Sequence, residues 1–127
     1  MGLDITNKTM PNAEIVNKIK SFNTKESDFL YQSLHFPKRY DENGNFLYHT
    51  LHDVVTLAYL IDESVIKLEK INCKIELKDI NRYGETVRCN CNDSVDSKKE
   101  QKSFDIYTGK EIELEKFWDI IYNVIAH

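Results

Sequence analysis

The sequence predicts an α+β domain in which an antiparallel sheet of about four to six strands supports a long central helix and amphipathic helices at both ends. Three observations lead to this fold class. Apolar residues recur at helical spacing across residues 50–68, apolar and polar residues alternate within 71–91, and the Asn-Gly pair at 43–44 indicates a hairpin turn. Residues 1–127 are therefore expected to form a single domain, with residues 1–10 loosely ordered.

The first helix is predicted at about residues 11–22. Apolar side chains recur there every three or four positions, Thr9 is the candidate N-cap, and Pro11 stands where a first-turn proline is tolerated. The stripe of apolar side chains indicates that one face of this helix is buried.

The segment that follows fits two structures. Residues 24–36 could form a short helix capped by Thr24, or a strand in which apolar side chains alternate. The Asn-Gly pair favours the second interpretation, because it is the strongest hairpin signal in the chain. We therefore expect a hairpin with strands near 33–40 and 46–50.

The central helix is predicted at residues 50–68. It is expected to be firm as far as Ile61 and to give way to a strand between Asp62 and Ile71. Asp53 in its first turn complements the helix dipole. Six apolar side chains form its buried stripe: Leu51, Val54, Ala58, Ile61, Val65 and Leu68.

The C-terminal half is predicted to supply the rest of the sheet and the last helix. Residues 71–77 and 87–91 alternate between apolar and polar side chains, as half-buried antiparallel strands do. Two shorter strands are expected at 104–106 and 112–114, separated by a Thr-Gly turn. Apolar residues at helical spacing predict a closing helix over 114–125.

The composition indicates a cytoplasmic protein that binds neither nucleic acid nor membrane. The net charge is −4 and the pI is about 5.6, with 14 Lys and 3 Arg, which argues against a nucleic-acid binder. No apolar run approaches the length of a membrane span or resembles a signal peptide. The 3 cysteines include no Cys-x-x-Cys pair, so a reducing compartment fits best. No cofactor is expected.

Polar residues gather at the start of the central helix. A two-residue turn would place His35 opposite His52 across the hairpin, close to Asp53. Two imidazoles and a carboxylate can hold a metal ion, or supply a general base with its orienting partner. His35, His52 and Asp53 are thus candidate metal ligands, and His49, His52 and Asp53 are candidate catalytic residues. The sequence favours the plainer alternative of packed or solvated histidines and an Asp that stabilises a helix dipole.

The cysteines and tyrosines have simpler interpretations. Cys73, Cys89 and Cys91 fall in the apolar phase of two strands, where a free cysteine behaves as a small hydrophobic residue. Tyrosines are common at protein interfaces because they combine apolar area with a polar tip. Four of the 7 tyrosines fall around the hairpin and the central helix, and they are candidate binding residues: Tyr31, Tyr40, Tyr48 and Tyr59.

These features favour a small regulator, inhibitor, or immunity or antitoxin protein that binds another protein stoichiometrically. The interpretation rests on size, mild acidity, the tyrosines and the lack of Gly-rich phosphate-binding or nucleophile-elbow motifs. It makes an enzyme the less favoured class, and it leaves self-association open.

The alternative is an enzyme or ligand-binding domain of the hot-dog type. The segment YHTLHDVV…KIELKDINRYGETVRC is similar in layout to acyl thioesterases, in which a sheet wraps around a central helix. That resemblance implies hydrolysis of an acyl thioester by polar residues at the start of the helix, here His49, His52 and Asp53. The chain departs from the hot-dog layout by ending in a helix where the last strand is expected.

Overall fold

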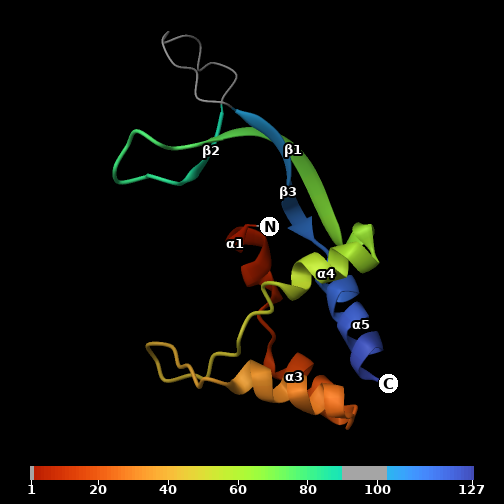
Figure 1. Ribbon diagram of the computed structural model, residues 1–127. Helices are drawn as coiled ribbons and strands as arrows, with labels where there is room; N and C mark the ends of the chain where they lie inside the picture. Colours follow the sequence, from red (N-terminus) through yellow and green to blue (C-terminus); the bar gives the residue numbers. More distant parts are fainter. Residues whose placement is uncertain (1, 90–102) are drawn as a thin grey trace. The chain divides into compact units, whose positions relative to one another are not determined.

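In the computed structural model, residues 2–89 and 103–127 are described, and they form five α-helices, two 3₁₀ helices and three strands (Figure 1). They divide into two compact units: unit 1 is Met1–Lys67 with Gly109–His127, and unit 2 is Leu68–Thr108. No helix within the described ranges is long and apolar enough to cross a membrane. The elements in chain order are α1 (Leu3–Thr6), η1 (Asn7–Thr9), α2 (Ala13–Ser21), α3 (Lys25–His35), α4 (Val54–Ile61), η2 (Glu63–Val65), β1 (Ile66–Ile75), β2 (Thr86–Arg88), β3 (Phe104–Ile112) and α5 (Leu114–Ile125).

The N-terminal residues are ordered, contrary to the expectation of a loose lead-in. Helices α1 and η1 bury Ile5 and Thr9, which are 1% and 0% exposed. The hydroxyl of Thr9 donates to the carbonyl oxygen of Thr6 at 2.8 Å, so it does not cap α2 as predicted. The cap of α2 is Asn12, whose side chain accepts a hydrogen bond from the backbone N–H of Ile15 at 2.9 Å.

Helix α3 continues to His35 and no strand follows it in residues 36–40, so the predicted first strand of the hairpin at 33–40 is wrong. Thr24 and Ser27 form a reciprocal capping box, in which each side chain accepts from the other residue's backbone N–H at 3.0 Å. Leu34 is fully buried whereas Phe36 is 79% exposed, so the apolar alternation did not mark one face of a strand. The capping signal at Thr24 outweighed that short alternation.

The predicted turn is present without the predicted strands. Tyr40 and Phe46 form an isolated antiparallel bridge around residues 41–45. The backbone N–H of Gly44 donates to the carbonyl oxygen of Asp41 at 3.0 Å, and Gly44 has a φ of 82°. That left-handed conformation explains why the turn carries glycine there.

The hydroxyl of Thr24 also joins two distant parts of unit 1. It donates to the carbonyl oxygen of Ile125 in the last turn of α5 at 2.6 Å, while it caps α3. We expect Thr24→Ala to lower the free energy of unfolding by about 1–2 kcal/mol, because one change removes both the cap and the bridge. Urea unfolding of the chain measures the loss.

Ser33→Ala provides the matched control for that change. The Ser33 hydroxyl donates to a carbonyl oxygen within α3 at 2.9 Å, and the residue is exposed. Its loss should change the free energy of unfolding by less than about 0.5 kcal/mol. Equal effects of the two substitutions would contradict the role assigned to Thr24.

The central helix is shorter than predicted. Helix α4 spans Val54–Ile61, and η2 and β1 follow it. The predicted change from helix to strand between Asp62 and Ile71 is confirmed, because α4 ends at Ile61 and β1 begins at Ile66. The Asp62 side chain caps η2 by accepting a hydrogen bond from the backbone N–H of Ser64 at 2.8 Å. The helix was predicted to extend past Ile61 because Val65 falls at helical spacing in the sequence. Val65 is fully buried, but it belongs to η2 and not to α4.

The sheet has three strands in the described residues, in the order β2-β1-β3, where about four to six were predicted. β1 pairs antiparallel with β2, with Cys73 opposite Arg88. β3 runs unbroken through the predicted Thr-Gly turn. Lys70 and Asp105 form an exposed ion pair at 2.8 Å, and their hydrogen bond raises the pKa of Lys70 and lowers the pKa of Asp105. An exposed pair of this kind adds little stability.

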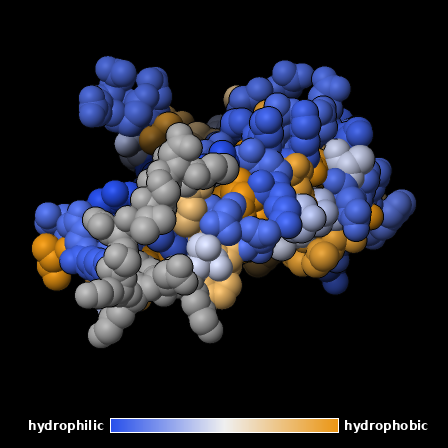
Figure 2. Space-filling view, turned by 90° about the horizontal axis from the view of Figure 1, so that it is seen from above, coloured by the Kyte–Doolittle hydropathy of each residue, from blue (hydrophilic) through white to orange (hydrophobic). Residues whose placement is uncertain are grey.

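Helix α5 provides the centre of the core of unit 1. The predicted closing helix is confirmed, and its apolar face buries Phe117, Trp118 and Ile121. Phe117 and Trp118 meet edge to face, with ring centroids 5.1 Å apart. Many other apolar side chains reach the surface, where they form the orange areas among hydrophilic groups in Figure 2. Unit 1 therefore has a small packed core and a substantial exposed apolar surface.

Candidate functional site

Asp53 stands at the N-cap position of α4, the position where a carboxylate is favoured by the helix dipole. Its side chain makes no capping hydrogen bond and is exposed. The backbone carbonyl of Asp53 accepts from the N–H of Thr56 at 3.1 Å, which closes the first turn. The carboxylate of Asp53 is therefore accessible to a ligand.

His52 is held in place by a buried threonine. Its Nδ1 lies 2.8 Å from Oγ1 of Thr6, a residue only 3% exposed. Whichever atom carries the proton, this hydrogen bond orients the ring and occupies Nδ1. The ring is exposed, and no residue in the described part of the chain hydrogen-bonds to its Nε2. Nε2 is thus the atom of His52 that can exchange a proton with a ligand.

His49, the other predicted catalytic histidine, has a structural role. Its Nε2 donates to the carbonyl oxygen of Pro37 at 2.7 Å, and its backbone N–H donates to the carbonyl oxygen of Leu34 at 3.0 Å. Both bonds fasten the segment before α4 to the end of α3. With Nε2 engaged in this way, His49 is the weaker catalytic candidate.

The three candidate metal ligands are not brought together. Nδ1 of His35 donates to the carbonyl oxygen of Tyr31 at 2.6 Å, one turn earlier in α3. Within residues 2–89 and 103–127, no three His, Cys, Asp or Glu side chains are placed to hold a metal ion. The predicted approach of His35 to His52 depended on a strand where the chain forms a helix.

The predicted binding tyrosines lie mainly in one aromatic cluster. The ring of His35 is 4.2 Å from that of Tyr31 and 5.1 Å from that of Tyr48, measured between centroids. Phe46 packs on His35, and Tyr40 meets Phe46 edge to face at 5.6 Å. Tyr59 lies on α4 and is half-buried. Partner binding by these tyrosines stays a prediction.

The turn at residues 41–45 supports one side of this cluster. The carboxylate of Asp41 accepts from the backbone N–H groups of Asn43 and Asn45, at 2.9 and 2.8 Å, and from the side chain of Asn45 at 2.9 Å. These bonds, with that of the Asn45 side chain first, hold the pKa of Asp41 below its usual value. The carboxylate of Asp41 therefore stabilises the turn.

The two cysteines in the described residues offer no sign of a nucleophile. Cys73 is 5% exposed, as expected of a core residue, and Cys89 is half-buried. Cys91, predicted to be a third core cysteine, falls outside the described residues.

Thr6 is the site residue that the sequence did not reveal. It stands 46 positions before His52, in a segment expected to be loosely ordered. No local pattern connects a lone threonine with a distant histidine, so only the fold could identify the pair.

Comparison with known proteins identifies the family. A sequence model described as inosine-uridine preferring nucleoside hydrolase matches residues 1–119. The inosine-uridine preferring nucleoside hydrolase of Leishmania major is 25% identical over 126 residues, covering 98% of this chain and 38% of that enzyme. The chain thus spans about two fifths of the length of the curated relatives that it matches.

Two solved structures share the fold. A plant nucleoside hydrolase superposes on the whole chain with a TM-score of 0.75 at 17% identity, over 41% of its own length. A purine-preferring ribonucleoside hydrolase from Gardnerella vaginalis matches 98% of the chain with a TM-score of 0.64 at 19% identity, over 38% of its length. These similarities identify the Rossmann-like α/β fold of nucleoside hydrolases and correct the predicted α+β class.

The functional interpretations from the sequence are corrected by the same findings. Neither a regulator that acts by stoichiometric binding nor a thioesterase of the hot-dog type fits a family of nucleoside hydrolases. The preference for a protein without catalytic activity is contradicted as well. Small size and the lack of a familiar short motif were poor guides to the class of protein. The chain belongs to the inosine-uridine preferring nucleoside hydrolase family.

Proposed function

We propose that this chain takes part in the hydrolysis of the N-glycosidic bond of ribonucleosides, with His52 and Asp53 at the reacting site. The observation that carries the proposal is the family match over residues 1–119, which includes α4 and both of these residues. The substrate class follows the names of the relatives, among them the Leishmania major enzyme that prefers inosine and uridine.

The reaction sets clear chemical demands. Water attacks C1′ of the ribose, the bond from C1′ to the base nitrogen breaks, and the products are free ribose and free base. Glycosidic cleavage of this kind passes through a transition state with positive charge on the sugar ring. The leaving base needs a proton, and the attacking water must lose one.

His52 supplies the proton to the leaving base in the proposed reaction. Its Nδ1 is occupied by Thr6, and its exposed ring presents Nε2 as the proton donor to the leaving base. The neighbouring carboxylate of Asp53, free of capping bonds, accepts hydrogen bonds from the ribose hydroxyls and favours positive charge on the ring.

A chimeric enzyme tests the proposal. The matched segment of the Leishmania major relative is replaced by this chain, and the release of ribose from inosine and from uridine is measured as reducing sugar. We expect ribose release well above that of the uncatalysed reaction. The unmodified relative is the positive control, and this chain alone is measured in parallel.

The control variant is the same chimera with Asp53→Asn, which keeps the size of the side chain and removes its charge. Loss of ribose release in this variant, with the circular dichroism of the parent, would support the assigned site. A folded chimera that releases no ribose from either nucleoside would contradict the proposed function.

A further inference from the structure

An open cavity of about 700 Å³ lies between the η1–α2 segment and α5 within unit 1, and it is here called the polar cavity. Its two sides differ in charge. The η1–α2 side carries Lys8, Lys18 and Glu14, whereas the α5 side carries Glu115 and Asp119. The other lining residues are Met10, Asn12, Ile15, Leu114, Trp118 and Tyr122.

The charged side chains of the polar cavity do not neutralise one another. The ion pairs within residues 2–89 and 103–127 all lie elsewhere in the structure. Glu115 and Asp119 stand four residues apart on one face of α5, where like charges repel each other. The cavity therefore presents carboxylates on one side and ammonium groups on the other, and both are accessible to a ligand.

Two buried aromatic residues add polar groups to the same lining. Trp118 is 5% exposed and Tyr122 is 9% exposed, and both contribute to the cavity. In the described part of the chain, no group accepts a hydrogen bond from the indole N–H of Trp118, and none pairs with the Tyr122 hydroxyl. Buried polar groups in folded proteins are nearly always hydrogen-bonded, so these two indicate a ligand that completes the site.

The side chain of Tyr122 is a point where several of these groups meet. Nζ of Lys18 lies 3.9 Å from the centroid of the Tyr122 ring, so α2 reaches across to α5 there. Burial raises the pKa of the Tyr122 hydroxyl, and the negative charges of Asp119 and Glu14 raise it further. A cation and two carboxylates thus act on one buried residue of the cavity.

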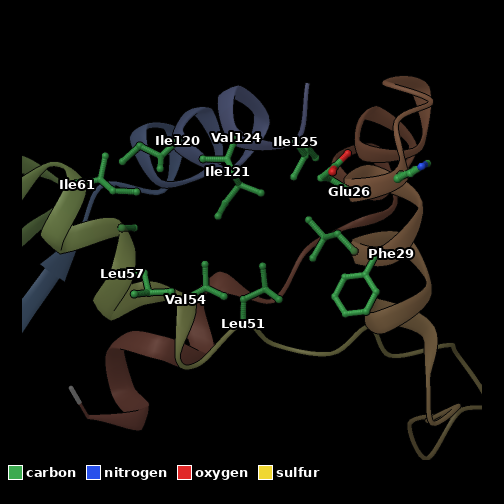
Figure 3. A pocket seen from close by; sticks show the side chains of 13 residues that line it. Glu26, Phe29, Leu51, Val54, Leu57, Ile61, Ile120, Ile121, Val124 and Ile125 are labelled. Carbon is green, nitrogen blue, oxygen red and sulfur yellow. The ribbon is translucent and has the colours of Figure 1, made fainter. Parts of the chain in front are cut away.

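The cavity between α3, α4 and α5 lacks this chemistry (Figure 3). Its lining is apolar apart from Lys25 and Glu26 of α3, so little in it would orient a small polar ligand. Sites for small molecules usually combine apolar walls with a few well-placed polar groups. The polar cavity has both, since its apolar side chains are accompanied by charges of each sign.

We propose that the polar cavity binds a free α-amino acid with an apolar side chain. The ammonium group of the ligand lies between Glu115 and Asp119, where it relieves their mutual repulsion. Its carboxylate faces the two lysines and accepts a hydrogen bond from the indole N–H of Trp118, and its side chain contacts the apolar part of the lining. The inference goes beyond the proposed function, because it involves none of the residues assigned to hydrolysis.

Trp118 allows a direct test, because it is the single tryptophan of the chain. L-leucine is titrated into the 127-residue chain, and the indole N–H is followed as one side-chain signal in ¹H–¹⁵N NMR spectra. We expect a saturable shift of this signal, with one ligand per chain by calorimetry and a Kd below about 1 mM. 3-Methylbutylamine and 4-methylpentanoate each lack one charge of leucine, and they should bind at least about tenfold more weakly.

Variants that neutralise one charge locate the site. Asp119→Asn and Lys18→Gln, on opposite sides of the cavity, should each weaken leucine binding at least about threefold. Asp28→Asn and Lys20→Gln are the matched controls, because they neutralise exposed charges that do not line the cavity. The controls should change the Kd by less than about twofold, since salt screens distant charges. Circular dichroism first establishes that each variant is folded.

Three results would overturn the inference. One is the lack of a saturable change in the Trp118 signal when leucine is added. Another is equal affinity for leucine and for either probe with a single charge, because the site would then not recognise an amino acid. The third is an equal loss of affinity in the cavity variants and their controls, which would place binding elsewhere. None of these measurements includes a nucleoside, so their failure is distinct from failure of the proposed function.

Discussion

Replacing His52 with alanine is expected to lower kcat for ribonucleoside hydrolysis by about 10²–10⁴-fold in the chimeric enzyme. The substitution removes the proposed proton donor to the leaving base and leaves the proposed contacts of Asp53 with the ribose. KM should therefore change much less than kcat. Steady-state kinetics on inosine and uridine measure both constants.

Thr6 gives that prediction a second part. Thr6→Val keeps the volume of the side chain and removes the hydroxyl that lies 2.8 Å from Nδ1 of His52. The ring should lose its fixed orientation, so kcat should fall by a smaller factor than in His52→Ala, about tenfold. KM should change much less than kcat, because Thr6→Val leaves Asp53 unaltered.

His49→Ala is the control for both changes. Nε2 of His49 donates a hydrogen bond to the carbonyl oxygen of Pro37. This substitution should therefore lower the free energy of unfolding and have little effect on kcat. A loss of kcat in His49→Ala as large as that in His52→Ala would show that the roles of the two histidines were assigned wrongly.

Phe117→Ala is expected to cost about 3–5 kcal/mol of folding free energy. Phe117 is 0% exposed at the centre of unit 1, where its ring meets Trp118. Truncation removes the ring and leaves a cavity between α5 and its neighbours. Small domains are stable by only about 5–15 kcal/mol, so this loss removes a large part of the free energy of unfolding. Urea and thermal unfolding, followed by circular dichroism, measure the loss.

Phe29→Ala is the matched control in the isolated chain. Phe29 of α3 is 74% exposed, so its truncation should change the free energy of unfolding by less than about 0.5 kcal/mol. A loss below about 1 kcal/mol for Phe117→Ala would contradict the position of Phe117 at the centre of the core.

The sequence was most informative for elements whose local pattern indicates a single secondary structure. The spacing of Phe117, Trp118 and Ile121 was sufficient to predict α5, and the change of apolar period placed the helix-to-strand boundary between Asp62 and Ile71. It failed for α3, where a capping signal at Thr24 competed with a short alternation and an Asn-Gly turn. Local patterns that disagree cannot be ranked without the packing that selects between them.

The fold class and the site failed for a different reason. Periodicity shows which face of an element is apolar, but it does not show what that face contacts, so the packing of α3, α4 and α5 could not be read from it. His52 and Asp53 were named as candidates because they lie among polar residues at the start of the predicted central helix. The contact between Thr6 and His52 joins residues that carry no shared pattern, and the aromatic cluster around His35 appeared only once α3 was seen as a helix.

The bond from Thr24 to Ile125 has a consequence for the order in which the chain folds. It joins residues 101 positions apart, so a long loop must close before it forms. α2 completes its N-cap from its own residues, whereas α3 gains the second bond of its cap residue only after α5 has docked. Contacts of such high sequence separation slow folding in general. We therefore expect α3 to reach full protection against hydrogen exchange together with α5, and later than α2.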